Sequence, residues 1–190
     1  MFQTLINRIG FWNGWLFMCV FILQMIVIGF GGKAVRRRTH VSGDQRSQYT
    51  GQGIGFIANL IWLLTLVYSV FLPLRTGTVW FYTGLAVFLT GLFILSAATV
   101  HFMTTPVTQM IQKGVYSISR HPMYLSTFLI CLGTGLAAAS PVFIVLTVIM
   151  TVIFHFEAVL EEKVCLKNYD DYDLYMKQVK RWIGRSRAKN

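Results

Sequence analysis

The sequence predicts an all-α, polytopic membrane protein with about five transmembrane helices. Of its 190 residues, 55% are hydrophobic and only 13% are charged, which is too apolar for an ordinary soluble domain. The apolar residues fall into five runs separated by polar connections. The formal net charge of +10 therefore indicates contact with membrane lipids, and no nucleic acid is expected as a partner, because a soluble nucleic-acid binder cannot bury so many apolar side chains.

The first three runs cover residues 11–30, about 54–74 and about 79–100. Each approaches the roughly 20 mainly apolar residues that a spanning helix needs. The second run ends near Pro73, and a tight Arg75-Thr-Gly-Thr78 turn leads into the third. The first run lacks a clear cleavage site and its heavier basic flank follows it, so a true span is favoured over a cleaved signal peptide.

The fourth and fifth runs, residues 124–139 and 142 to about 156, predict a helical hairpin with Ser140-Pro141 at its tip. Proline cannot continue a helix but fits the first turn of the next one. Each arm is short, so the pattern leaves open whether the hairpin fully crosses the bilayer. The charged and aromatic chain after residue 160 has helical potential and predicts a cytoplasmic carboxyl-terminal helix without a further span.

The distribution of basic residues predicts the orientation. With the amino terminus outside, five basic residues of the first connection, two of the third and eight after the fifth run lie inside, against Arg8 and Arg75 outside. The positive-inside rule therefore supports five crossings with a cytoplasmic carboxyl terminus. A re-entrant hairpin with four crossings divides the charges less well.

One integrated domain is expected. Residues 1–100 would supply the first three helices, and residues 101–190 a catalytic region. The three cysteines have unrelated spacings that indicate neither a disulfide framework nor a metal site. The histidines and glutamates match no metal-binding spacing, so no metal is expected. Glycine-rich nucleotide loops and a nucleophile elbow are also missing from the sequence.

Polar residues cluster at positions 109–124 and 157–175, which flank the two ends of the predicted hairpin. Because one short turn joins the other ends of its arms, the start of the fourth run and the end of the fifth must lie close together. We therefore expect Arg120-His121 to face Glu161-Glu162 at the cytoplasmic boundary.

Each of these residues also has a purely structural interpretation. Arg120 near a helix start is often a snorkelling interfacial residue, and His121-Pro122 is a plausible helix start. Glu157 and Glu161 share a helix face, and a helix at the membrane interface can expose both.

The remaining polar groups also have structural interpretations. Tyr169, Tyr172 and Tyr175, spaced three apart, most simply predict an aromatic stripe at the membrane interface. His101 and His155 end apolar runs, where a half-buried neutral histidine is as good an interpretation as a ligand.

Several motifs follow one another in the carboxyl-terminal half. They are Gly114-Val-Tyr116, Arg120-His121-Pro122-Met-Tyr124, Glu161-Glu162, Tyr169-Asp-Asp-Tyr172, and then Tyr175, Val179 and Arg181. In this order and spacing they resemble the isoprenylcysteine carboxyl methyltransferase family and its phospholipid methyltransferase relatives. The resemblance covers about residues 104–183, and the first three runs match only in being apolar.

The resemblance implies an S-adenosyl-L-methionine site at the cytoplasmic helix ends, without a Rossmann domain. Glutamates suit the positive sulfonium and ammonium, and Arg120 or His121 suits the carboxylate. Carried over by position, the residues of the cofactor pocket would be His101, Thr108, Gln109, Met110, Ile111, Tyr116, His121, Pro122, Met123, Tyr124, Glu161 and Glu162.

The sequence departs from the family pattern at one position. The prenylcysteine enzymes carry an arginine about four residues before the glutamate pair, and this chain has Glu157 there. An acidic group suits an amine acceptor or acts as a proton acceptor. Arg120 and Glu157 are therefore the predicted catalytic residues. The acceptor would be lipophilic and come from the bilayer: a prenylcysteine-like carboxylate, a phospholipid amine or another small lipid.

Two alternatives stay open at this point. Membrane sterol reductases, which use NADPH, share a similar carboxyl-terminal layout, and Cys165-Leu-Lys-Asn-Tyr169 with Arg181 faintly resembles them. The proline after His121 and the glutamate pair favour the methyltransferase. A non-catalytic membrane scaffold is the other alternative. Stabilisation by S-adenosylhomocysteine, by NADPH or by neither ligand would discriminate among the three.

Overall fold

The computed structural model of the chain describes residues 10, 12–29, 56–106 and 108–185. Within these ranges every regular element is a helix, and extended chain pairs only at the isolated bridges Asn13–Pro73 and Val179–Arg185. The all-α prediction is confirmed. The helices are α2 (Trp15–Gly29), a helix over Phe56–Val70, α4 (Val79–Thr104), the 3-10 helix η1 (Gly114–Ser117), α5 (Pro122–Ala137), α6 (Pro141–Asn168) and α7 (Tyr172–Gln178).

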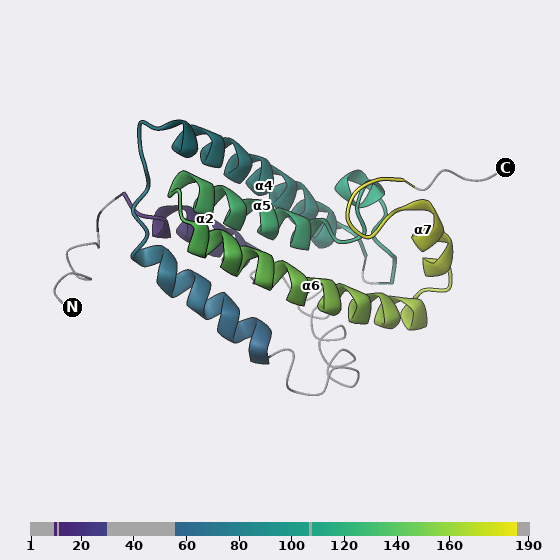
Figure 1. Ribbon diagram of the computed structural model, residues 1–190. Coiled ribbons are helices and arrows are strands. Elements are labelled where there is room, and N and C mark those ends of the chain that lie inside the picture. Colours follow the sequence, from purple (N-terminus) through teal and green to yellow (C-terminus); the bar gives the residue numbers. More distant parts are fainter. Residues whose placement is uncertain (1–9, 11, 30–55, 107, 186–190) are drawn as a thin grey trace.

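The longer helices lie side by side, and the two ends of the bundle differ (Figure 1). At one end α2 and α4 begin and the α5–α6 turn lies. Backbone hydrogen bonds from Gly14 N–H to the Leu72 carbonyl (2.7 Å) and from Arg75 N–H to the Ala137 carbonyl (2.9 Å) tie this end together. At the other end α5 begins, α6 ends, and η1 and α7 gather. The chain thus alternates between the two ends as the sequence predicts.

Glycines bring α4 and α5 into backbone contact. A Cβ atom on Gly84 of α4 would collide with the backbone of Gly133 and Ala137 of α5, and one on Gly133 would collide with the backbone of Phe88. Gly91 makes a similar approach to Ile130 further along. Small residues allow such close approach where lipid weakens the hydrophobic drive between helices. The start of α5 is therefore fixed beside the end of α4.

The predicted hairpin is confirmed. The Ser140 hydroxyl accepts a hydrogen bond from Phe143 N–H (3.3 Å) and caps α6, whose first residue is Pro141. The helix is longer than the fifth apolar run, because it continues to Asn168. No glycine or proline interrupts the sequence from Val142 to that residue. The three glutamates consequently lie on one continuous helix with the apolar run.

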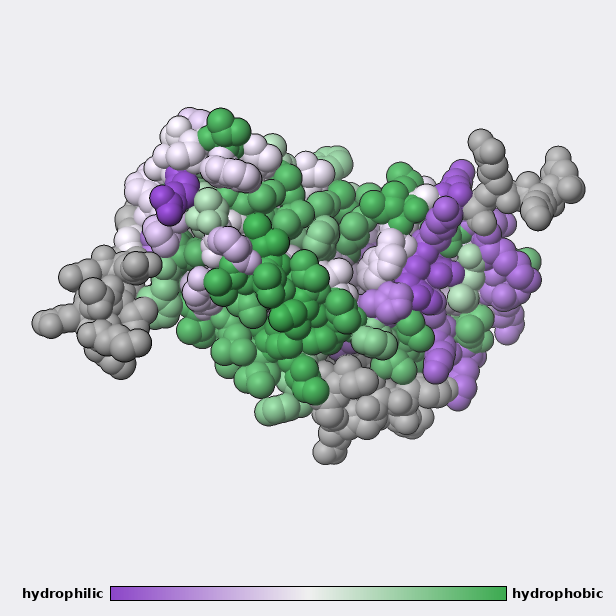
Figure 2. All heavy atoms as spheres, in the orientation of Figure 1, coloured by the Kyte–Doolittle hydropathy of each residue, from purple (hydrophilic) through white to green (hydrophobic). Residues whose placement is uncertain are grey.

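The surface has the character of a membrane protein. By length and composition α4 and α6 are long and apolar enough to cross a membrane, and α2, α5 and the helix Phe56–Val70 are shorter apolar helices. Hydrophobic residues cover the middle of the face in Figure 2, and most hydrophilic residues gather at the end that carries α7. Five crossings and the orientation stay predictions. Arg8 and the basic residues of the first connection lie outside the described residues.

Candidate active site

The start of α5 is tied to the tail that follows α7. His121 N–H donates to the Ser119 hydroxyl (3.2 Å), and this hydroxyl in turn donates to the Arg181 carbonyl (3.2 Å). Backbone bonds run from Arg120 N–H to the Lys180 carbonyl (3.2 Å) and from Gly184 N–H to the Ile118 carbonyl (2.8 Å). Two short segments far apart in the sequence therefore form one unit at this end of the bundle.

Glu162 binds three cationic or potentially cationic side chains. Arg181 holds its carboxylate with two donors, Nε to Oε1 (3.0 Å) and Nη2 to Oε2 (2.7 Å). Arg120 Nη2 lies 3.0 Å from Oε1, and His121 Nε2 lies 3.2 Å from the same oxygen. The glutamate is only 3% exposed, so this charge is stable in the interior only because these partners compensate it. Glu162 thereby joins α6, the start of α5 and the tail.

Glu161 makes different contacts from its neighbour. Its Oε1 accepts a hydrogen bond from the Tyr124 hydroxyl (2.6 Å), and its Oε2 lies 3.5 Å from His121 Nδ1. Its side chain keeps 32% of its surface exposed. Glu157 Oε2 lies 3.5 Å from the same Tyr124 hydroxyl, and Glu157 is buried. The expectation that Arg120-His121 faces Glu161-Glu162 is confirmed.

The two glutamates also influence the pKa of His121. Burial of the imidazole is the largest single influence and lowers its pKa. The hydrogen bonds and charges of Glu161 and Glu162 together outweigh burial, so the pKa of His121 is raised above its ordinary value. Folding therefore shifts the imidazole toward its protonated form, which can donate to both carboxylates.

Arg120 has a donor that suits a ligand oxygen. Its Nη1 donates to the Met176 carbonyl (3.3 Å) and its Nη2 pairs with Glu162. Among the described residues its buried Nε has no hydrogen-bond partner. A buried N–H of this kind calls for a specific explanation. A carboxylate oxygen of a bound cofactor would satisfy it, so the residues present fit an amino-acid cofactor.

Some of the predicted site residues lie near the end of α4 and beside α7, and the rest gather around the glutamates. His101, on the last turn of α4, packs against Gly114, whose φ of +60° and lack of a side chain permit the approach. Thr108 and Gln109 are exposed and Ile111 is half-buried, and Met110 packs with the aromatic residues of α7. The predicted residues that meet through side-chain contacts around the glutamates are Arg120, His121, Tyr124, Glu157, Glu161 and Glu162. Pro122 and Met123 occupy the first turn of α5 between them.

The predicted interfacial stripe of tyrosines is wrong for two of its three members. Tyr172 and Tyr175 are buried, with their rings edge to face at 5.7 Å, and Val179 completes their cluster. The Tyr175 hydroxyl donates to the carbonyl of Tyr116 (2.6 Å), which is itself buried. The helix α7 therefore packs against η1 with its aromatic face buried. A three-residue spacing alone does not predict this burial.

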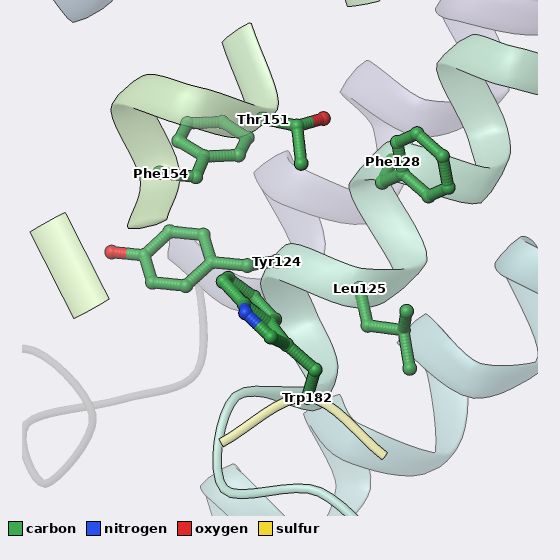
Figure 3. Close-up of a pocket in the computed structure, with 6 residues that line it drawn as sticks. All are labelled: Tyr124, Leu125, Phe128, Thr151, Phe154 and Trp182. Atoms are coloured by element: carbon green, nitrogen blue, oxygen red, sulfur yellow. The ribbon is translucent and has the colours of Figure 1, made fainter. Parts of the chain in front are cut away.

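The sequence analysis identified neither a pocket that lies beside the carboxylates of Glu157 and Glu161 nor a site role for Arg181. The pocket measures about 210 Å³, and Figure 3 shows its lining residues. They are Tyr124, Leu125, Phe128, Thr151, Phe154 and Trp182. The pair of adjacent glutamates signals a need for a compensating cation, which Arg181 supplies. The place of Trp182 depends on how the tail folds, and no spacing in the sequence predicts it.

A model of the phospholipid methyltransferase family matches residues 76–172, slightly more than half of the chain. The chain belongs to the phospholipid methyltransferase family. The matched region runs from the start of α4 to the first residue of α7. It contains both the Arg120–Tyr124 motif and the glutamate pair, and it ends before Arg181. No curated protein matches this family member. Family membership together with the apolar helices α4 and α6 supports a membrane methyltransferase.

Proposed function

We propose that this member of the phospholipid methyltransferase family transfers a methyl group from S-adenosylmethionine to a lipophilic acceptor from the bilayer. The observation that carries the proposal is the meeting of His121 and Tyr124 with Glu161 and Glu162 at one end of the bundle. The matched family is one of methyltransferases, and this cluster supplies groups that suit the methyl donor.

The groups of the cluster suit different parts of the cofactor. Glu161 is partly exposed and oriented by the Tyr124 hydroxyl, so its carboxylate suits a sulfonium or ammonium. The unpartnered Nε of Arg120 suits the cofactor carboxylate. When bound, the cofactor supplies the activated methyl group, and the protein contributes orientation and electrostatics.

Glu162 has a different proposed role from its neighbour. Both of its oxygens are engaged by Arg120, Arg181 and His121. It therefore acts as a positioning residue that holds Arg120 and the tail in place, whereas the family resemblance implied that both glutamates line the cofactor pocket. Direct cofactor contact is proposed for Glu161.

The chain holds the acceptor in line with the transferred methyl group. In such a transfer the acceptor's nucleophile would form a bond to the methyl carbon as the carbon–sulfur bond breaks, and the sulfur would keep the electron pair. Alignment of this kind is a large part of what an enzyme supplies. If the acceptor is an amine that arrives protonated, Glu157, a buried carboxylate beside Tyr124, takes the proton and frees the nitrogen electron pair for the transfer.

The proposal is tested by incubating membranes that contain the protein with methyl-labelled S-adenosylmethionine and separating the lipids. A labelled lipid is expected that membranes without the protein do not form. Glu161→Gln should lower the labelling strongly. Asp170→Asn, an exposed carboxylate in the turn before α7, is the matched control and should leave it unchanged. An absence of labelled lipid with the intact chain would overturn the proposal.

The position of the label tests Glu157. If the labelled atom is a nitrogen, Glu157→Gln should slow transfer by about 100-fold or more, the usual contribution of a positioned base. Equal rates in Glu157→Gln and the intact chain for every labelled acceptor would exclude this role.

A further inference from the structure

A pocket of about 210 Å³ lies between α5 and α6, next to the carboxylates. Leu125 and Phe128 of α5 form one wall, and Thr151 and Phe154 of α6 form another (Figure 3). The Thr151 hydroxyl donates to the Thr147 carbonyl within the helix (2.8 Å), so this polar group is already satisfied. The pocket therefore offers an apolar surface to whatever occupies it.

Trp182, from the tail that follows α7, lines one side of the pocket. In Figure 3 its indole lies beside the ring of Tyr124. The preceding residue, Arg181, is held by Glu162 through two donors. After Trp182 the chain reverses at Gly184, whose φ of +115° favours glycine, and Gly184 N–H binds the Ile118 carbonyl. Anchors on both sides therefore hold the backbone of Trp182 in place at the edge of the pocket.

Tyr124 connects the pocket to the carboxylates. Its ring lines the pocket and lies 4.9 Å, between centroids, from the ring of Phe154. Its hydroxyl donates to Glu161, with Glu157 Oε2 3.5 Å away. A molecule with its apolar part against Phe154 and Trp182 would thus have its adjacent polar group beside these two glutamates.

The size of the pocket limits its occupant. A buried apolar cavity of about 150 Å³ holds one benzene, so about 210 Å³ provides room for a ring or a short branched segment. Val148 and Val152 flank Thr151 on α6 and are exposed. A longer chain leaving the pocket would continue over this apolar face of α6.

We propose that this pocket binds the apolar segment next to the nucleophile of the methyl acceptor, and that Trp182 and Thr151 determine which acceptors fit. The occupant is an acceptor with a ring-sized or branched segment beside its nucleophile and its remaining hydrocarbon along α6. This inference rests on the proposed methyltransferase function and adds the substrate class and two specificity-determining residues.

Filling the pocket is the first test. Thr151→Phe places a ring in the pocket, and Ile149→Phe places the same ring at an exposed position on the opposite side of α6 as a matched control. Methyl transfer is measured on a total lipid extract dispersed in detergent micelles with labelled S-adenosylmethionine. Thr151→Phe should raise the extract concentration for half-maximal transfer by about tenfold or more, the usual effect of a misfitted apolar pocket. Stabilisation by S-adenosylhomocysteine should be unchanged in both variants.

Widening the pocket is the second test and does not depend on the first variant folding. Trp182→Ala should change which lipids of the extract are labelled and admit bulkier ones. Ile183→Ala, the exposed next residue, should leave the set of labelled lipids as it is. An intact chain that labels lipid, together with Thr151→Phe and Trp182→Ala that behave as their controls, would overturn the pocket assignment alone. An intact chain that labels no lipid would overturn the proposed function.

Discussion

At the scale of single residues, Glu161 and Glu162 show how adjacent carboxylates acquire different tasks. Successive side chains on a helix point about 100° apart, so Glu162 points to the two arginines and Glu161 points to Tyr124. Glu162 is buried, whereas the side chain of Glu161 is partly exposed to solvent. We therefore assign structural cohesion to Glu162 and ligand contact to Glu161.

Glu162→Gln is expected to destabilise the protein by about 3 kcal/mol, because it leaves buried cationic partners without their counter-charge. Thermal unfolding in detergent measures the change. Asp173→Asn is the control, since Asp173 pairs with Lys177 while both side chains are more than 60% exposed, and such a pair contributes less than about 1 kcal/mol. Equal losses in the two variants would contradict the assignment.

The raised pKa of His121 predicts a pH-dependent stability. The folded state favours the protonated ring, so its contribution is fully present below the ordinary pKa of 6.5. The contribution is lost as the pH rises through the raised pKa of the folded protein. The difference in melting temperature between the intact chain and His121→Gln should therefore be largest below pH 6.5 and narrow above it. A difference that widens with rising pH would show that the neutral ring is the stabilised form.

At the scale of elements, the glycine contact between α4 and α5 decides where the site lies. Gly84 and Gly133 let the two backbones touch, and this contact fixes the start of α5 beside the end of α4. The capped Ser140-Pro141 turn then returns the chain along α6. The glutamates reach the Arg120 motif because these two packing features set the position and direction of α6.

Gly133→Ala should destabilise the protein by about 1–3 kcal/mol, the usual cost of forcing extra atoms into a packed interface. Its new Cβ would collide with the backbone of Phe88, which cannot move independently of α4. Gly135→Ala, in the same helix, would first meet the side chain of Ile144 and should cost less. Melting temperatures and the yield of monodisperse protein in detergent compare the two variants. A greater loss in Gly135→Ala would argue against the proposed role of the α4–α5 contact.

The hairpin and the meeting of its two polar flanks were predictable, because they follow from chain connectivity and from Ser140-Pro141. The extension of α6 to Asn168 was not predicted from the apolar run. Hydropathy ends that run near Phe156, but no glycine or proline breaks the helix there. The burial of Tyr172 and Tyr175 depends on contacts between η1, α7 and the tail. Contacts of this kind between distant segments leave no periodic signal.

At the scale of the whole molecule, most hydrophilic residues gather at the end of the apolar bundle that carries α7 (Figure 2), and the polar contacts of the site lie at the same end. This arrangement suits a water-soluble methyl donor that arrives from one side and an apolar acceptor that arrives laterally. The positive-inside rule predicts that this end lies in the cytoplasm.

The orientation is tested with a reporter that is active on only one side of the membrane, fused in turn to the carboxyl terminus and at the turn near Gly77. The carboxyl-terminal fusion is expected to report a cytoplasmic location, because the predicted topology assigns most basic residues of the connections to that side. The fusion near Gly77 is expected to report the opposite side. The same location for both fusions would contradict the predicted topology.

The central claim is that the end of the bundle where α5 begins binds the methyl donor, and ligand binding tests it most directly. Calorimetry on the detergent-solubilised full chain should show binding of S-adenosylhomocysteine and no binding of NADPH. Glu161→Gln should weaken the affinity by about tenfold or more, since a hydrogen bond to a charged group contributes about 1.5–3 kcal/mol, and Asp170→Asn should not. Binding of NADPH alone, or equal affinity for S-adenosylhomocysteine in Glu161→Gln and the intact chain, would contradict the account.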